Sequence, residues 1–163
     1  MRPGRPRTLA ELERDAMRRV PGPEAKHAMS ARSVVAQAGA FRTAAERSIE
    51  EGLLLPAISS LHEASRLAIT AVAALKGWRF ANAPGAHEAV IDYALGIRLV
   101  DRRQFAQLDA LRDLRHQVNY PADIIAPTEA EARQFAGLVD DVIALAIGEM
   151  PRRRIPPQPP AGR

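Results

Sequence analysis

Residues 108–121 read LDALRDLRHQVNYP. Leu108, Leu111, Leu114 and Val118 recur at intervals of three and four, which predicts an amphipathic helix with one apolar face. At about 100° per residue, Arg115 falls within that face. An unpaired buried guanidinium costs several kcal/mol, so we expect Arg115 either to meet an acid or a carbonyl in the core or to line a cleft. In a cleft, a ligand or a second subunit would supply the negative charge.

Polar side chains gather toward the end of this helix. Pro121 should stop the helix directly after a tyrosine, because proline cannot continue the backbone hydrogen bonding. Two polar residues flank the arginine on the same face, and a histidine follows it in the sequence. The candidate ligand-binding residues are therefore Arg112, Arg115, His116, Asn119 and Tyr120.

The composition limits the kinds of site that the chain can build. With 163 residues and 47% hydrophobic content, we expect one core of ordinary size. Cysteine is absent, which excludes disulfides and thiolate chemistry. We expect no metal or other cofactor, and surface or helix-end positions for the four histidines, which show no ligand spacing: His27, His62, His87 and His116. No secretory signal or membrane span is visible in the sequence, so we expect a cytoplasmic protein with no membrane contact.

The positive charge is concentrated at the two ends of the chain. The net charge is +4, but residues 1–7 and 151–163 together carry seven arginines and no acid, which leaves −3 for residues 8–150. Both end segments lack apolar periodicity, so we expect disordered basic tails. Any affinity for nucleic acid is expected to reside in these tails and to be weak and salt-sensitive.

Helical periodicity dominates the rest of the chain, and no segment alternates with period two over a strand's length. Residues 53–76 are apolar on more than one face, so this helix is either the central element or meets a second copy of the protein. The loop at 77–85 carries the only tryptophan, whose expected role is to plug one end of the bundle. Thr128 and Glu131 form a capping box at the start of the last helix. The predicted helices are 9–20, 24–51, 53–76, 86–97, 102–120 and 129–149.

These elements predict an all-α fold, an up-and-down bundle of four to five helices with short connections. We divide the chain into a basic tail with a short helix (1–25), the helical bundle (26–149) and a Pro/Arg-rich tail (150–163). Most enzyme templates are excluded, because the chain has no glycine-rich phosphate loop, no nucleophile elbow and no His-Glu-x-x-His motif.

The order of the motifs resembles the HEPN domain over roughly residues 26 to 149. The second long helix ends in Leu75-Lys76-Gly77-Trp78, a loop leads to Gly85-Ala86-His87, and Leu111-x-x-Leu114-Arg115-His116-x-x-x-Tyr120 precedes a capped last helix. In catalytic members of this family an arginine, a polar residue and a later histidine meet at a dimer cleft. There the histidine is placed for acid–base work and the arginine for the scissile phosphate. Arg115 and His116 match the first two positions, and Tyr120 stands where the histidine is expected.

The tyrosine favours a non-catalytic role, because a phenol with a pKa near 10 is a poor base at neutral pH. The resemblance implies a binding or partner module that contacts nucleotide or RNA through an arginine-lined cleft of a homodimer. It also implies association with a nucleotidyltransferase or a toxin–antitoxin-like system. Two alternatives remain open. One is a metal-independent HEPN ribonuclease using Arg115 with His116 or Tyr120, and the other is a structural bundle with Arg115 in a buried ion pair.

Overall fold

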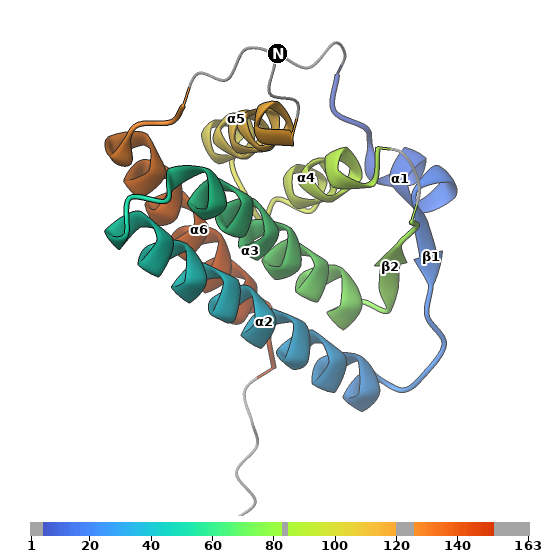
Figure 1. The fold of residues 1–163 in the computed structure, drawn as a ribbon. Coiled ribbons are helices and arrows are strands. Elements are labelled where there is room, and N and C mark those ends of the chain that lie inside the picture. The colour runs from blue at the N-terminus through green and yellow to red at the C-terminus, as the bar shows by residue number, and fades with distance from the viewer. Residues whose placement is uncertain (1–4, 83–84, 120–125, 152–163) are drawn as a thin grey trace, which may run out of the picture.

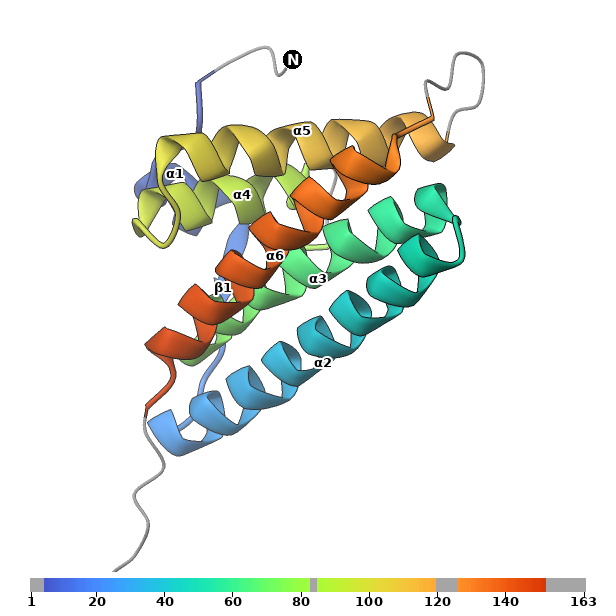
Figure 2. The same cartoon turned by 90° about the vertical axis from the view of Figure 1, so that its left-hand side faces the viewer.

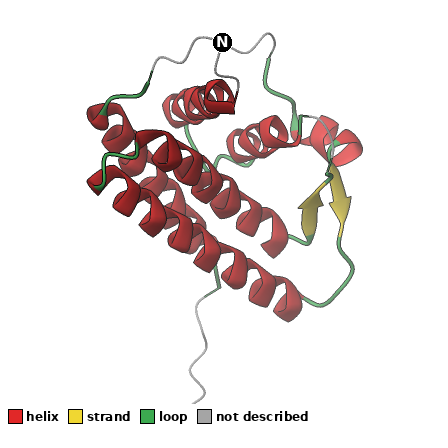
Figure 3. Cartoon of the chain, viewed as in Figure 1, coloured by secondary structure: helices red, strands yellow, loops and turns green. Residues whose placement is uncertain are grey.

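The computed structural model describes residues 5–82, 85–119 and 126–151, without the side chains of residues 118 and 119. Within these ranges the chain forms six helices and a two-stranded antiparallel ribbon (Figures 1 and 3). The expectation of an all-α bundle is confirmed, with the short ribbon as an addition. The elements are α1 (Leu9–Asp15), β1 (Met17–Arg19), α2 (Glu24–Glu50), α3 (Leu54–Leu75), β2 (Trp78–Phe80), α4 (Ala86–Gly96), α5 (Arg102–Asn119) and α6 (Glu129–Glu149).

Helix α3 is the central element. It contacts α2, α4, α5, α6 and β2, and residues along its whole length are buried. Figure 2 shows α2, α3 and α6 lying side by side, with α4 and α5 stacked across one end of this layer. The chain itself therefore covers both apolar faces of α3, which is the first of the two alternatives that its sequence allowed.

Local sequence signals place the ends of the long helices. Gly52, with φ of +72°, makes the sharp turn from α2 into α3, a conformation that glycine adopts without a Cβ penalty. The Thr128 side chain accepts a hydrogen bond from the backbone of Glu131 at the start of α6, as predicted. Within the described residues no helix is long and apolar enough to cross a membrane.

The predicted helix over 9–20 is wrong in its second half. Helix α1 ends at Asp15, and the next residues form β1, which pairs with β2 in the register Met17↔Phe80, Arg18↔Arg79 and Arg19↔Trp78. Each strand has only three residues, too few for period-two alternation to show in the sequence. The tryptophan loop that was expected to be irregular therefore contains a strand.

The N-terminal segment contacts the bundle more closely than a detached tail would. Arg5 pairs with Glu11 at 2.6 Å, and the Nε of Arg7 donates to the fully buried carboxylate of Asp92 at 3.0 Å. A buried carboxylate needs such a partner. Residues 1–4 and 152–163, for which we predicted disorder, lie outside the described residues.

Candidate functional site

Arg112 is the buried arginine of α5. It is 4% exposed, and its guanidinium lies 2.9 Å from Asp109, 2.7 Å from Asp113 and 3.4 Å from Glu88 of α4. Three carboxylates therefore surround a single cation, which satisfies the requirement that a buried charge be paired. These carboxylates neutralise the charge of Arg112, so this arginine has no charge left to offer a ligand.

Arg115 lies three residues further along α5 and has a different environment. It is half-buried, and it forms no ion pair with any residue that the structure describes. Its charge acts instead on two imidazoles, His62 of α3 and His87 of α4. The structural alternative, in which Arg115 pairs with a core acid, therefore finds no such acid among the described residues.

His62 and His87 form a pair between α3 and α4. Their ring centroids are 5.2 Å apart, with the planes inclined by 45°. His62 is only 3% exposed, and His87 is half-buried in the first turn of α4. The Nδ1 atoms of both rings are buried and have no hydrogen-bond partner in the described part of the chain. Two buried ring nitrogens are thus unsatisfied beside a cation.

Both histidines are held neutral. Burial, and then the nearby charge of Arg115, lower the pKa of His62 to about 3. The same two causes lower the pKa of His87 below its ordinary value. At neutral pH these rings carry no charge, so the positive charge at this position comes from arginine.

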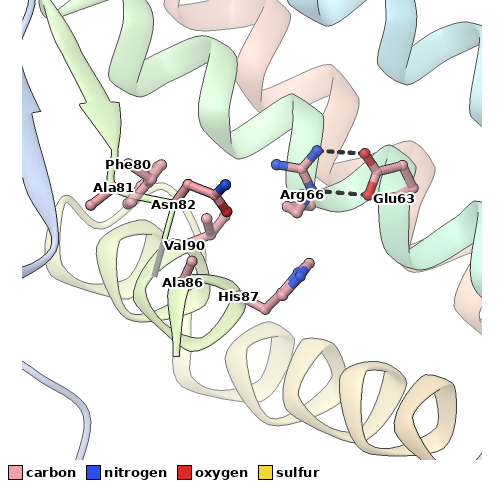
Figure 4. Close-up of a pocket in the computed structure, with 8 residues that line it drawn as sticks. All are labelled: Glu63, Arg66, Phe80, Ala81, Asn82, Ala86, His87 and Val90. Atoms are coloured by element: carbon pink, nitrogen blue, oxygen red, sulfur yellow. Dashed lines mark hydrogen bonds and ion pairs between the residues drawn. The ribbon is translucent and has the colours of Figure 1, made fainter. Parts of the chain in front are cut away.

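A cavity of about 340 Å³ opens beside this pair. Its walls include the aromatic ring of Phe80, the amide of Asn82, the imidazole of His87 and the guanidinium of Arg66 (Figure 4). Arg66 is fixed on α3 by a two-pronged hydrogen bond to Glu63, which lowers the pKa of that carboxyl. The cavity falls at the small end of the range for ligand pockets, and it offers both a ring and polar groups to a ligand.

The structure brings together some of the residues predicted from the sequence. Arg115 lies with the histidine pair, whereas His116 is exposed on α5 and reaches this group only through an electrostatic interaction with His87. Asn119 ends α5, but its side chain lies outside the described residues, as does Tyr120.

Sequence reasoning missed the two histidines. The expectation that His62 lies at the surface or at a helix end is wrong, because its ring is buried in the middle of α3. The available signal was an ionisable residue within the most apolar helix of the chain, a position that needs a local partner or a neutral state. The described residues contain no cluster of three or more potential metal ligands.

One of three comparisons with known proteins found a match. A family model described as HEPN domain matches residues 31–150, which span most of α2 and all elements from α3 to α6. Helix α1 and strand β1 lie before the matched region. Comparison with curated proteins found no match, and comparison with solved structures found none.

Proposed function

Since this chain belongs to the HEPN domain family, we propose that it is a non-catalytic HEPN-type binding module that takes the phosphate of a nucleotide or RNA at Arg115. One observation carries the proposal: Arg115 is half-buried, its charge acts on two neutral histidines, and it has no carboxylate partner in the described part of the chain. A half-buried arginine without a protein carboxylate is stabilised by binding an external anion. Phosphate fits because its oxygens can accept two parallel hydrogen bonds from the planar guanidinium.

The comparison with Arg112 strengthens this argument. Both arginines belong to the same helix, but Arg112 lies among three carboxylates, whereas the charge of Arg115 acts on two imidazoles. The adjoining cavity supplies Phe80 and Asn82, which suit the ring and the polar edge of a base.

The non-catalytic assignment rests on the sequence motif. Tyr120 stands where catalytic members of the family have histidine, and a phenol with a pKa near 10 is a poor proton acceptor at neutral pH. We further propose a homodimer, with a nucleotidyltransferase as protein partner in a toxin–antitoxin-like pair. The homodimer is proposed because HEPN domains form clefts between subunits, and the partner is proposed because members of the family associate with nucleotidyltransferases.

A second function, ribonuclease activity, is favoured by one specific observation. His87 is half-buried and neutral, and it lies close enough to Arg115 for the arginine's charge to lower its pKa. A neutral imidazole beside a phosphate-binding arginine has the two groups needed for metal-independent RNA cleavage. In this alternative His87 would replace Tyr120 or His116 as the base.

The test compares Arg115→Ala with Arg47→Ala, an exposed arginine near the end of α2 that serves as a matched control. Binding of a fluorescein-labelled mononucleotide and of a labelled single-stranded RNA would be followed by anisotropy. We expect Arg115→Ala to weaken mononucleotide binding by about tenfold, the loss of one charge-assisted contact, and Arg47→Ala to leave it unchanged. Equal affinities for the two variants would contradict the proposal.

RNA cleavage by the same proteins decides between the two functions. The non-catalytic module should release no fragments from the labelled RNA. Cleavage that disappears in His87→Ala and persists in Arg47→Ala would establish the ribonuclease instead.

A further inference from the structure

The two short strands lie at one end of the bundle (Figure 1) and carry exposed basic side chains. Arg18 lies directly opposite Arg79 across the strand pair, and Arg19 lies opposite Trp78. Lys76 comes just before β2. All four cations are exposed. We call this surface the basic ribbon, which consists of Arg18, Arg19, Lys76 and Arg79.

The ribbon is basic because two acid-free segments meet there. Residues 16–23 and 64–87 contain no aspartate or glutamate, although residues 8–150 as a whole sum to −3. Pairing of β1 with β2 brings these segments side by side. A local excess of positive charge therefore forms on a body whose net charge is negative.

The protein does not neutralise this charge. In the described part of the chain none of the four cations forms an ion pair with a carboxylate. Arg18 donates to the backbone oxygen of Met17 at 2.8 Å, and Arg19 donates to the backbone oxygen of Lys76 at 3.3 Å. The guanidinium of Arg19 also lies 4.4 Å from the centre of the Trp78 ring. Like charges directly opposite each other destabilise a strand pair, so the Arg18–Arg79 pairing costs stability that a bound polyanion would restore.

We propose that the basic ribbon binds the phosphate backbone of single-stranded RNA. Strand β2 ends at Phe80, and Phe80 and Asn82 line the cavity (Figure 4). Because successive side chains of a strand point to opposite faces, Phe80 lies on the face that carries Arg19, and Arg18 and Arg79 lie on the other face. A strand of RNA that wraps round the edge of the ribbon, from the face of Arg18 and Arg79 to the face of Arg19, therefore reaches a cavity of about 340 Å³, which suits one unstacked nucleotide. A duplex has no such nucleotide to offer, which is the reason for choosing a single strand.

This inference rests on the proposed function in taking RNA as the ligand, but it uses different residues. Strand β1 precedes the region 31–150 that matches the HEPN domain, so half of the ribbon lies outside the matched region. The ribbon also places nucleic-acid affinity in the body of the protein, whereas the sequence led us to expect it in the tails.

The experiment measures binding of a short fluorescein-labelled single-stranded RNA to the full chain over a series of salt concentrations. Arg18→Gln and Arg79→Gln should each lower the affinity about fivefold near 0.1 M salt and reduce the salt slope by about 0.7, the loss of one phosphate contact. Arg47→Gln removes the same charge from the other end of the bundle and should change the affinity by less than about twofold.

Arg79→Glu adds a readout that a purely structural residue would not give. It replaces a repulsive cross-strand pair with an attractive one, so the thermal midpoint should stay the same or rise. RNA affinity should fall further than in Arg79→Gln. If Arg79→Glu is at least as stable as the wild type but binds RNA less tightly, the positive charge at this position contributes to RNA binding and not to folding.

The outcomes separate this inference from the proposed function. Ribbon variants that bind RNA as tightly as the wild type, while Arg115→Ala binds weakly, would overturn the ribbon and leave the Arg115 site standing. Weakened ribbon variants with unchanged binding by Arg115→Ala would support the ribbon and contradict the Arg115 site. Equal wild-type affinity for duplex RNA would overturn the assignment to a single strand.

Discussion

Two arginines of α5 show how neighbouring residues set the role of a charge. Arg112 has acids three residues before it and one residue after it, and a third acid reaches it from α4. Arg115 has no such neighbours among the described residues and lies beside His62 and His87. The same side chain is therefore a structural ion-pair centre at one position and a candidate ligand contact at the other.

Replacement of each arginine tests this division. Arg112→Ala leaves acids around an empty buried position, so we expect the free energy of unfolding to fall by about 3–5 kcal/mol. Arg115→Ala removes a half-buried charge with no carboxylate partner among the described residues, and should cost about 1 kcal/mol or less. Urea denaturation of both variants measures the difference. Equal losses, or a larger loss in Arg115→Ala, would show that Arg115 is structural.

His62 should make the protein sensitive to acid. Burial, and then the charge of Arg115, lower its folded-state pKa to about 3, from an ordinary value near 6.5. As the pH falls from 6.5 toward 3, the unfolded chain takes up a proton that the folded chain excludes. The contribution of neutral His62 is therefore present above pH 6.5 and is lost progressively below it.

The variant His62→Asn isolates this effect, because asparagine does not titrate. We expect its unfolding free energy to decline less steeply than that of the wild type between about pH 6.5 and 4. Urea denaturation at a series of pH values gives the two slopes, whatever the absolute stability of the variant. Parallel curves would mean that His62 takes up its proton in the folded protein as easily as in the unfolded chain.

Among the elements, the turn between α3 and β2 determines where the ribbon lies. Gly77 makes this turn with φ of +74°, and a Cβ at this position would lie 2.9 Å from the ring of His27. That ring cannot easily move, because its Nε2 is 3.1 Å from the backbone oxygen of Val20, with which it is hydrogen-bonded. The start of α2 thus packs against the turn that directs β2 toward β1.

Two alanine substitutions should have opposite effects on stability. Gly77→Ala forces a side chain into the left-handed region and into contact with His27, so we expect a loss of at least about 1–2 kcal/mol. Gly39→Ala, in the interior of α2 with open space around the new methyl group, should gain about 0.5–1 kcal/mol. Thermal and urea denaturation of the two variants measure both changes. A Gly77→Ala protein as stable as the wild type would show that this turn tolerates a side chain.

At the level of the whole molecule, the chain covers its own core. Helix α3, whose two apolar faces raised the possibility of a dimer contact, is buried by the other elements of the same chain. Among the residues that the structure describes, the large apolar side chains that remain exposed are on α2 and α6 and in the turn before α3: Met29, Phe41, Leu53, Leu145 and Ile147. The apolar faces of α3 therefore no longer argue for a dimer contact at this helix.

The expected homodimer is a prediction from the HEPN family, in which subunits meet at a cleft. Static light scattering at micromolar concentration should give twice the chain mass of 17.8 kDa. We also expect Arg115→Ala to keep the same mass, because the arginine is assigned to a ligand and not to the subunit contact. If the wild-type protein has the mass of a monomer, the proposed homodimer is wrong.

The sequence by itself determined the helices and most of their ends. Apolar spacing, the turn at Gly52 and the capping box at Thr128 act through residues that are close together in the chain, so they can be recognised from a single sequence. The motif around Arg115 indicated the family in the same way, through the order of short local patterns.

Only the tertiary structure decided which residues meet across the chain. Met17 pairs with Phe80, and His62 meets His87 beside Arg115, through contacts between segments far apart in sequence. A periodic pattern shows which face of an element is buried, but it does not show which element covers that face. Whether an arginine is neutralised, or a histidine is kept neutral, depends on those covering elements, because electrostatic interactions act through space and not along the chain.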